Sequence, residues 1–273
     1  MSDLVNASAE LLSQLRKKKP LVHNITNYVT VNDCANIILA IGASPIMADD
    51  ISEASDIAAI SASLVLNIGT LNKRTVEAML AAGKRANELG IPVVLDPVGA
   101  GASTLRNETT HLILSEVKIS VVRGNMSEIS FIAGLSSNTK GVDAAEEDII
   151  SSDARKIASA VAEKQGCVAA ITGAIDVISD GKRLAAVSNG HRLLSNVTGT
   201  GCMITALVGS FCGAGKDAFV AAVAGVAAMG IAGEIAYEKA GDRGIGSFHL
   251  SIIDAISRLD EKILVERARI NEI

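Results

Sequence analysis

The chain alternates between short apolar segments and helix-like segments over most of its length. The apolar segments lie at 64–69, 93–96, 119–123 and 168–172. Between and before them, apolar residues recur at helical spacing at 6–16, 30–41, 53–61, 73–89, 104–115 and 153–165. Strands that are apolar on both faces and alternate with helices are typical of a mostly parallel sheet covered by helices on both sides. The sequence therefore predicts an α/β fold.

Shorter elements complete this pattern. We expect a short strand at 42–47 and a hairpin at 176–187, with Asp180 and Gly181 at its turn. Pro20 is followed by a polar segment at 23–27, and from Gly201 onward the chain reads as helix. Since no linker or low-complexity segment divides the chain, residues 1–273 are expected to form one domain.

The composition excludes several classes of protein. A net charge of −5 without a basic stripe argues against nucleic acid as the main partner. No charged-then-apolar leader opens the chain, and its four cysteines are scattered without a CxxC pair, so we expect a cytoplasmic protein. The most apolar stretch, 219–236, contains Glu234 and is rich in small residues. It is expected to be a buried helix rather than a membrane span.

Polar side chains follow the ends of five expected strands. They occur in the segments 47–50, 67–70, 96–101, 123–125 and 172–173. Because parallel strands end at the same edge of a sheet, where open α/β sheets bind ligands, these segments predict a shared cleft.

A glycine-rich turn at 196–202 (Asn-Val-Thr-Gly-Thr-Gly-Cys) leads directly into an apolar helix-like run. Gly199 and Gly201 would let the backbone approach a bulky anion, and the first N–H groups of the helix would point at that anion. The turn also fits an ordinary Thr-capped helix, so its sequence alone leaves both interpretations open.

Two carboxylates and one arginine stand at strand ends. Asp96 precedes a proline, which fits either a turn or a ligand-binding carboxylate. Asn125 and Glu128 have the spacing of a helix capping box, yet Glu128 also suits a hydrated Mg²⁺, and Arg123 suits phosphate oxygens. Neither the dinucleotide fingerprint nor a Walker A motif is present. Together these residues favour phosphoryl transfer.

In these motifs the chain resembles the hydroxyethylthiazole kinase family of the ribokinase-like superfamily. The resemblance rests on the 196–202 turn and on the segments 23–27, 45–48, 96–101, 123–128 and 246–248, and it covers essentially the whole chain. It implies a three-layer α/β/α fold without a separate lid domain. It also implies a homotrimer with active sites at subunit interfaces, and a phosphotransferase that uses Mg²⁺ and ATP on the hydroxyl group of 4-methyl-5-(2-hydroxyethyl)thiazole in thiamine salvage.

The resemblance also implies a role for each matching residue. Met47 and Gly199 would contact the thiazole substrate, with Asn27 as a further neighbour. ATP would be bound by Arg123 and Thr172. Asp96 and Glu128 would hold Mg²⁺ directly or through water, and Cys202 would be the catalytic residue in the place where most of the superfamily has Asp.

Cys202 is expected to be a modest contributor to the rate. A thiol at a helix N-terminus has a pKa below its ordinary value of about 8.5, although ATP phosphates would raise it again. Its thiolate would accept the proton of the substrate hydroxyl, but the loose transition state of phosphoryl transfer demands little from a base. The anion-binding turn, Mg²⁺ and Arg123 would therefore supply most of the rate.

Two alternatives remain at this point. One is another ribokinase-like enzyme: a hydroxymethylpyrimidine or pyridoxal kinase, or an ATP-dependent NAD(P)H-hydrate dehydratase, for which Asp in place of Cys202 would be expected. The other is a nucleotide-binding sensor without catalysis, in which Asp96, Glu128 or the glycines would have been lost.

Overall fold

A nine-stranded sheet forms the central layer. The computed structural model describes residues 3–135 and 144–273. In these residues the strands are β1 (Leu21–Ile25), β2 (Ser44–Ile46), β3 (Ser63–Asn67), β4 (Val93–Asp96), β5 (Val121–Asn125), β6 (Val168–Thr172), β7 (Asp176–Ser179), β8 (Leu184–Val187) and β9 (Ile270–Glu272). Their order is β2-β1-β3-β4-β5-β6-β7-β8-β9. Pairing is parallel from β2 to β6 and antiparallel from β6 to β9, which confirms the predicted mostly parallel sheet.

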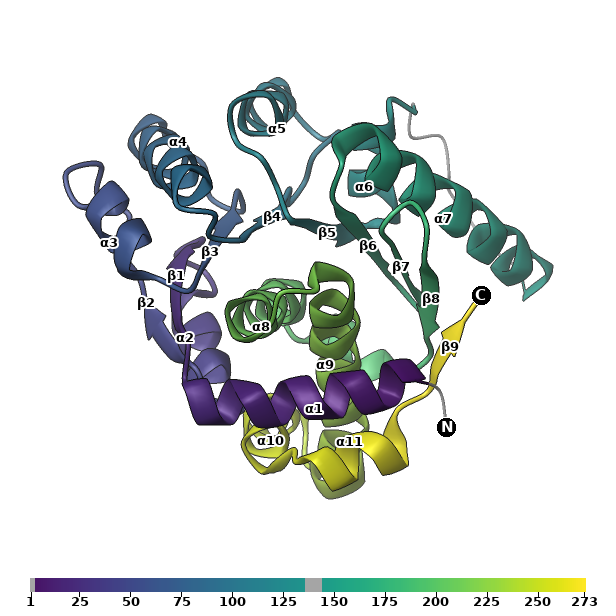
Figure 1. The fold of residues 1–273 in the computed structure, drawn as a ribbon. Helices are drawn as coiled ribbons and strands as arrows, with labels where there is room; N and C mark the ends of the chain where they lie inside the picture. Colours follow the sequence, from purple (N-terminus) through teal and green to yellow (C-terminus); the bar gives the residue numbers. More distant parts are fainter. Residues whose placement is uncertain (1–2, 136–143) are drawn as a thin grey trace.

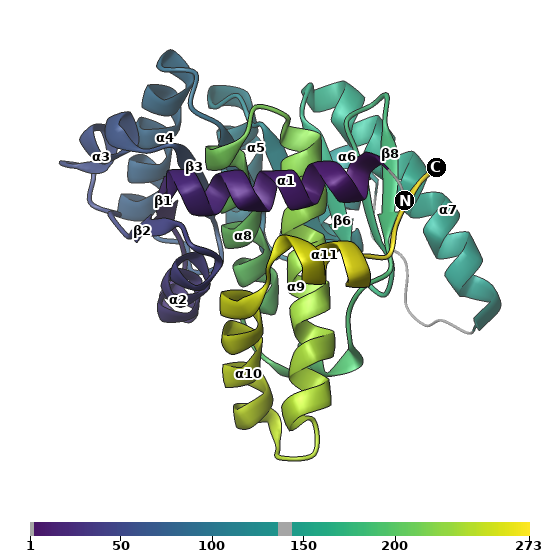
Figure 2. The same ribbon diagram turned by 60° about the horizontal axis from the view of Figure 1, so that its bottom comes forward.

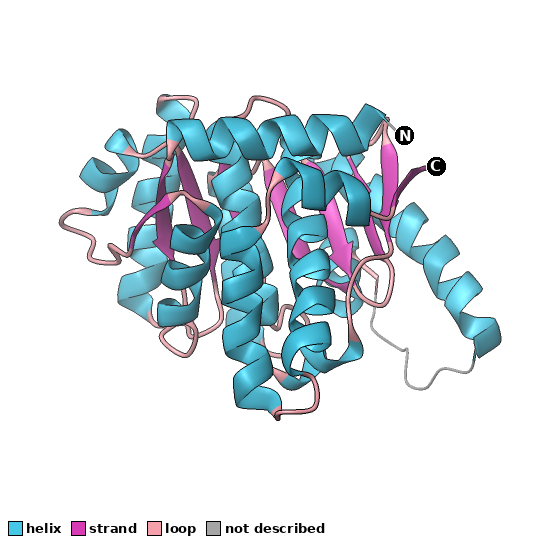
Figure 3. Cartoon of the chain, turned by 90° about the horizontal axis from the view of Figure 1, so that it is seen from below, coloured by secondary structure: helices cyan, strands magenta, loops and turns pink. Residues whose placement is uncertain are grey.

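Helices cover both faces of the sheet (Figure 1). One face carries α1 (Asp3–Lys18), α2 (Val31–Ile41), α8 (Thr200–Ala214), α9 (Ala218–Ala240), α10 (Ile245–Arg258) and α11 (Glu261–Arg267). The other carries α3 (Ala54–Ile60), α4 (Lys73–Glu88), α5 (Thr104–Glu116), α6 (Met126–Ala133) and α7 (Ala144–Gln165). A 3₁₀ turn, η1 (Arg192–Asn196), precedes α8. The result is the three-layer arrangement, with a separate apolar core on each side of the sheet (Figure 3).

Helices α8 and α9 lie closest to the centre of the sheet, and glycines permit that approach. A Cβ on Gly209 would fall 2.3 Å from Cγ2 of Val65 in β3, and one on Gly225 would fall 2.8 Å from the backbone of Val208. Helix α1 then packs across α8, α9 and α11 (Figure 2). Small residues in α8 and α9 therefore let these helices pack tightly against the sheet and against each other.

The expectation of a buried helix at 219–236 is confirmed. By length and hydropathy α9 is the one helix among the described residues that passes as a possible membrane span, but 78% of its most apolar window is buried inside the fold. The segment before it, 210–217, is a helix end followed by a new start. Asp217 caps α9 by accepting the N–H groups of Phe219 and Val220.

Two strands differ from the sequence analysis. The segment described only as polar, 23–27, contains the end of β1, which lies between β2 and β3. His23 is fully buried there, and its Nε2 pairs with the Ala48 carbonyl oxygen at 2.7 Å. The expectation of helix from Gly201 to the end is wrong for β9, which pairs with β8. The hairpin turn at Asp180 and Gly181 is confirmed.

Candidate active site

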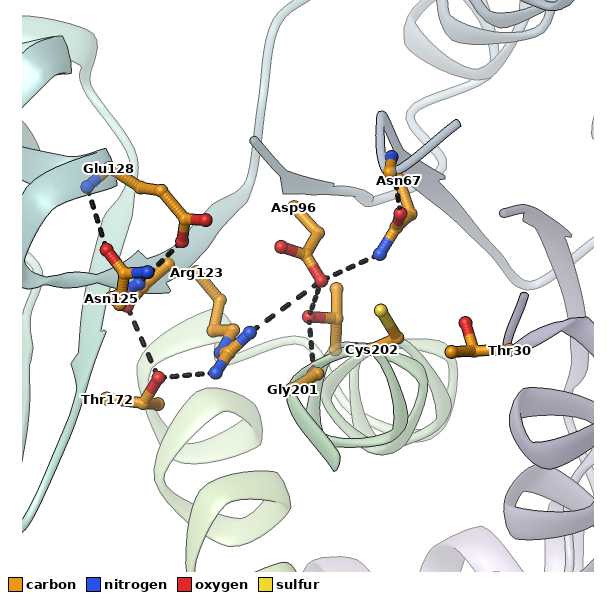
Figure 4. Close-up of polar contacts among 12 residues, drawn as sticks. Thr30, Asn67, Asp96, Arg123, Asn125, Glu128, Thr172, Gly201 and Cys202 are labelled. Carbon is orange, nitrogen blue, oxygen red and sulfur yellow. Dashed lines mark hydrogen bonds and ion pairs between the residues drawn. The ribbon is translucent and has the colours of Figure 1, made fainter. Parts of the chain in front are cut away.

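Four polar side chains gather where β3 to β6 end (Figure 4). Side chains alternate between the two faces along a strand, and each of these lies two positions after a residue packed on the α8 side of the sheet. The four side chains therefore project toward the first turn of α8. They belong to Asn67, Asp96, Arg123 and Thr172. Asn67 and Asp96 are also direct register partners of β3 and β4. The structure thus brings side chains from four of the five strand ends together, while Met47 and Asp49 of the fifth line a cavity with Thr70.

The remaining strand end behaves differently. Asp49 and Asp50, which follow β2, lie 4.0 Å and 3.6 Å from the guanidinium of Arg74 at the start of α4. These are exposed ion pairs, which contribute little to stability.

Asp96 is completely buried and has one occupied and one free oxygen. Its Oδ2 accepts hydrogen bonds from Nδ2 of Asn67 and Oγ1 of Thr205, both at 2.8 Å. Its Oδ1 is buried without a hydrogen-bond partner. Burial raises the pKa of Asp96 to about 6, and the positive charge of Arg123 opposes the shift more than any other group. An unsatisfied, buried carboxylate oxygen is the kind of atom that a bound cation satisfies.

Arg123 lies against the first turn of α8. Its Nη1 is 3.7 Å from Oδ2 of Asp96, and its Nη2 donates to the hydroxyl of Thr172. A Cβ on Gly201 would fall only 2.7 Å from Nη1. The guanidinium occupies the space that glycine leaves open at this helix start, so cationic nitrogens and helix N–H groups face the same site.

The turn after β6 is held by a buried acid. Asp176 accepts the N–H of Gly173 at 2.9 Å, directly after Thr172. Burial raises the pKa of Asp176 to about 7, against the opposing effects of that hydrogen bond and of Arg123. Sequence reasoning placed Asp176 only in a hairpin strand.

Glu128 forms the capping box that its spacing predicted. Asn125 Oδ1 accepts the N–H of Glu128 at 2.9 Å, while Oε2 of Glu128 accepts the N–H of Asn125 at 2.7 Å. Oε1 accepts the N–H of Gly99 at 2.8 Å, which ties α6 to the loop after β4. The charge of Glu128 also raises the pKa of Asp96, so the two carboxylates share one electrostatic environment. Capping leaves further lone pairs on both oxygens for a ligand.

The glycine-rich turn starts α8 as predicted. Gly199 is its N-cap residue with φ +86°, a conformation that favours glycine. A Cβ there would also fall 2.5 Å from Cγ2 of Thr30, at the start of α2. The turn therefore depends on glycine for both its backbone conformation and its packing.

Cys202 is half-buried in the first turn of α8, and the expected lowering of its pKa is wrong. Burial raises the pKa of this thiol, and the negative charge of Asp96 adds to the effect. Hydrogen bonds from Thr30, Asn67 and Asn27 act in the opposite direction. Desolvation of the thiolate therefore outweighs the favourable end of the helix dipole.

Met47 lies apart from this cluster, in an adjacent cavity of about 170 Å³. The cavity is also lined by Asn24, Tyr28 and Thr70. Both polar side-chain atoms of Asn24 are buried without a hydrogen-bond partner. Asn27 connects the Cys202 side of the site to this cavity. Its Nδ2 lies 3.3 Å from Sγ of Cys202, and the following residue, Tyr28, lines the cavity. A larger cavity of about 450 Å³, lined by Lys118 and Lys216, lies at the opposite edge of the sheet, away from the expected site residues.

Thr205 and Arg106 are further residues at the site without an assigned role in the sequence analysis. Thr205 reaches Asp96 from one turn further along α8. Arg106 of α5 donates to the carbonyl oxygens of Ile68 (2.8 Å), Gly69 (2.8 Å) and Val98 (2.5 Å), which joins the loops after β3 and β4. The only sequence signal for Thr205 is a hydroxyl inside an apolar run, and Arg106 has none.

The model of the "Hydroxyethylthiazole kinase family" matches residues 12–262. The chain belongs to this family. It is 69% identical over 273 residues to a protein named hydroxyethylthiazole kinase from Ruminiclostridium cellulolyticum, with all of both chains covered. The solved hydroxyethylthiazole kinase structure from Pyrococcus horikoshii matches with a TM-score of 0.89 and 40% identity, over 97% of this chain and 98% of that one.

A more distant structure shares the fold. Pyridoxal kinase from Staphylococcus aureus, solved in complex with ADP, matches with a TM-score of 0.60 and 16% identity, over 80% of this chain and 88% of that one. At this identity the likeness concerns the fold alone. The predicted three-layer ribokinase-like fold is thereby confirmed.

Proposed function

We propose that this chain transfers the γ-phosphoryl group of ATP to the hydroxyl group of 4-methyl-5-(2-hydroxyethyl)thiazole, in thiamine synthesis and salvage. Membership of the family and the 69% identical relative support this activity. The observation that carries it is the meeting of Asp96, Arg123 and Thr172 at the N-terminal turn of α8. This set combines a carboxylate for a cation, a guanidinium for phosphate and N–H donors for the transferring group.

Binding of ATP is assigned to the Arg123 side of the site. The planar guanidinium suits phosphate oxygens, and Thr172 already accepts one of its N–H groups. The open N–H groups of the first turn of α8, at Gly201 and Cys202, would face the phosphoryl group as negative charge develops on it. These fixed donors need no rearrangement during transfer, so they supply much of the rate.

The residues present fit Mg²⁺. Asp96 offers a buried oxygen without a partner, and Glu128 offers a second carboxylate nearby. Within the described part of the chain, no group of three His, Cys, Asp or Glu side chains is placed to hold a metal. Mg²⁺ commonly binds through one or two carboxylates, with water and phosphate oxygens as further ligands. We therefore assign Asp96 and Glu128 to a Mg²⁺ that neutralises charge on the ATP phosphates when bound.

The acceptor substrate is assigned to the other side of Cys202. Gly199, which packs against Thr30 at the start of α8, is assigned to this substrate side, and Met47 and Asn24 line the neighbouring cavity. An apolar thioether beside an amide suits a heterocycle that carries both apolar and hydrogen-bonding atoms. With its hydroxyl near Cys202, the substrate would pass its proton to the thiolate. Because the pKa of this thiol is raised, we assign Cys202 a modest catalytic role.

We also propose a cytoplasmic homotrimer of single-domain subunits, with active sites at the subunit interfaces. Tyr28 supports this arrangement, because it lines the Met47 cavity and yet is 78% exposed in the single chain. A neighbouring subunit would cover that ring and complete the cavity. Light scattering of the purified protein would then give three times the 28.1 kDa chain mass. A monomer at active concentrations would contradict the trimer.

The activity is tested by measuring ADP release with three acceptors in parallel: hydroxyethylthiazole, hydroxymethylpyrimidine and pyridoxal. We expect thiazole-dependent release that requires Mg²⁺ and exceeds release with the other two. Turnover with another acceptor only would assign the chain to a different ribokinase-like activity. Lack of turnover with all three would favour the hydrate dehydratase or the sensor, and either result would contradict the proposed activity.

A further inference from the structure

Two asparagines form a continuous hydrogen-bonded connection between Cys202 and Asp96. The Nδ2 of Asn27 lies 3.3 Å from Sγ of Cys202 and donates to Oδ1 of Asn67 at 3.0 Å. The Nδ2 of Asn67 in turn donates to Oδ2 of Asp96 at 2.8 Å. Both asparagines are at least 95% buried, with exposed fractions of 5% and 2%. The connection joins the first turn of α8 to the ends of β3 and β4.

The backbone fixes the orientation of both amide groups. Oδ1 of Asn67 accepts the N–H of Gly69 at 2.9 Å, and Oδ1 of Asn27 accepts the N–H of Thr30 at 3.1 Å. A backbone N–H can only donate, so the atom facing it in each case must be the amide oxygen. Both NH₂ groups therefore point into the site, toward Cys202 and Asp96.

Packing holds this arrangement in place. A Cβ on Gly69 would fall 2.9 Å from Cβ of Asn27 and 2.7 Å from its Nδ2. The glycine at 69 thus lets Asn27 lie flat against the loop after β3. Asn67 is the register partner of Asp96 in the sheet, which keeps the two side chains next to each other.

We propose that Asn27 and Asn67 are positioning residues for phosphoryl transfer, which hold Cys202 and Asp96 in a fixed relation by directing N–H donors at both. The inference rests on the proposed function, in which Cys202 faces the substrate hydroxyl and Asp96 faces the metal. The two amides act through these groups. Their hydrogen bonds end on the thiol and the carboxylate, whereas the guanidinium that binds ATP is held by Asp96 and Thr172.

The chain offers a way to measure this arrangement without substrate. Cys202 is half-buried, whereas Cys34, Cys167 and Cys212 are buried and have their thiol pKa raised to about 12 by burial. Iodoacetamide should therefore modify Cys202 first, since alkylation requires an accessible thiolate. N–H donors stabilise a thiolate, so losing them should slow the reaction.

The test compares the parent sequence with three variants: Asn67→Leu, Asn27→Leu and the double variant. The rate of iodoacetamide addition at Cys202 is followed by mass spectrometry at one fixed pH, without nucleotide, metal or thiazole. We expect each single variant to react roughly threefold to tenfold more slowly. The double variant should react no more slowly than the slower single variant, because the two amides act as one unit. If Asn67→Leu does not fold, Asn67→Ser is used, as its side chain is too short to join Asp96 and Asn27.

Thr205→Val is the matched control. Thr205 donates to the same Oδ2 of Asp96 at the same 2.8 Å as Asn67, and valine has nearly the same shape. Thr205 lies outside the Asn27–Cys202 connection. Loss of its hydroxyl should therefore leave the alkylation rate of Cys202 within twofold of the rate in the parent sequence. Equal slowing by Thr205→Val, additive slowing in the double variant, or a folded Asn67 variant that reacts at the normal rate would each overturn the proposal.

Steady-state kinetics provide a second measurement. For the Asn67 variant we expect kcat with the thiazole to fall at least tenfold while KM for ATP stays within twofold. A fall in kcat together with a comparable rise in KM for ATP would indicate general damage and contradict a positioning role. Absence of thiazole turnover in the unmodified chain would contradict the proposed function, whereas the alkylation comparison would still decide the role of the asparagines.

Discussion

Asp96 and Arg123 form a buried ion pair, with Oδ2 and Nη1 3.7 Å apart at the ends of two adjacent strands. Each partner also has another contact: Asp96 with Asn67 and Thr205, and Arg123 with Thr172. The pair therefore joins the carboxylate assigned to the metal to the guanidinium assigned to phosphate. Displacing the guanidinium itself should therefore impair the site, and a side chain at position 201 would do so.

We expect Gly201→Ala to weaken the use of ATP. The new Cβ would lie 2.7 Å from Nη1 of Arg123 and would displace the guanidinium from the start of α8. The value of kcat/KM for ATP should fall roughly 10- to 100-fold, as for the loss of a transition-state donor. Gly246→Ala is the control, since a Cβ there has no neighbour within 4 Å, and it should behave like the unmodified chain. Equal kinetics for both variants would show that Arg123 is not confined by Gly201.

Replacements of Cys202 should separate its chemistry from its position. We expect Cys202→Ser to lose no more than the roughly 10²–10⁴-fold typical of a removed general base, with ATP binding unchanged. Cys202→Asp should remain active, because a carboxylate at this position also accepts a proton. A loss far beyond that range in the serine variant would give Cys202 the main catalytic role. A folded but inactive aspartate variant would count against its proposed place beside the substrate hydroxyl.

Glu128→Gln should raise the requirement for Mg²⁺. The change keeps the size of the side chain but removes its charge, and the concentration of Mg²⁺ at half-maximal rate should rise roughly 10- to 100-fold. Asn125→Ala removes the side-chain cap of α6, which lowers the free energy of unfolding by about 1 kcal/mol, and keeps Glu128 itself in place. It should lower the melting temperature with little effect on Mg²⁺. If both variants change the Mg²⁺ requirement equally, Glu128 acts only as a capping residue.

Asp176→Asn should change how stability depends on pH. Burial raises the pKa of Asp176 from 3.8 to about 7 in the folded chain, so the folded state binds this proton more tightly than the unfolded state. The resulting stability is present at low pH and is lost as pH rises through 7. Denaturant titration measures the free energy of unfolding at each pH. Between pH 5 and pH 8, this free energy should fall by roughly 1–4 kcal/mol more in the parent sequence than in the variant. Parallel curves would show that Asp176 does not carry this proton.

Much of the fold could be predicted because its signals are local. Strands β3 to β6 are apolar on both faces, and the helices between them repeat apolar residues at helical spacing, so short windows of sequence specify them. The cap of α6 follows from Asn125 and Glu128, and the start of α8 follows from Gly199. The motif residues also sufficed to indicate the family, which the family model matches over 12–262.

Interactions between distant segments decided the rest. β1 is paired on both sides, by β2 and β3, despite His23 and Asn24, and the Ala48 carbonyl provides a partner for the buried imidazole. β9 exists only through pairing with β8. Both partners come from elsewhere in the chain, so the local polarity of each segment could not reveal the strand.

The same division applies to the site. The sequence by itself determined which chemical groups stand at the strand ends, because an alternating α/β pattern directs them to one edge of the sheet. Only the tertiary structure decided that Met47 lies in a neighbouring cavity, that Asn27 and Asn67 join Cys202 to Asp96, and that the thiol pKa is raised. Burial and charge depend on residues far apart in the chain, and only the folded structure brings them together.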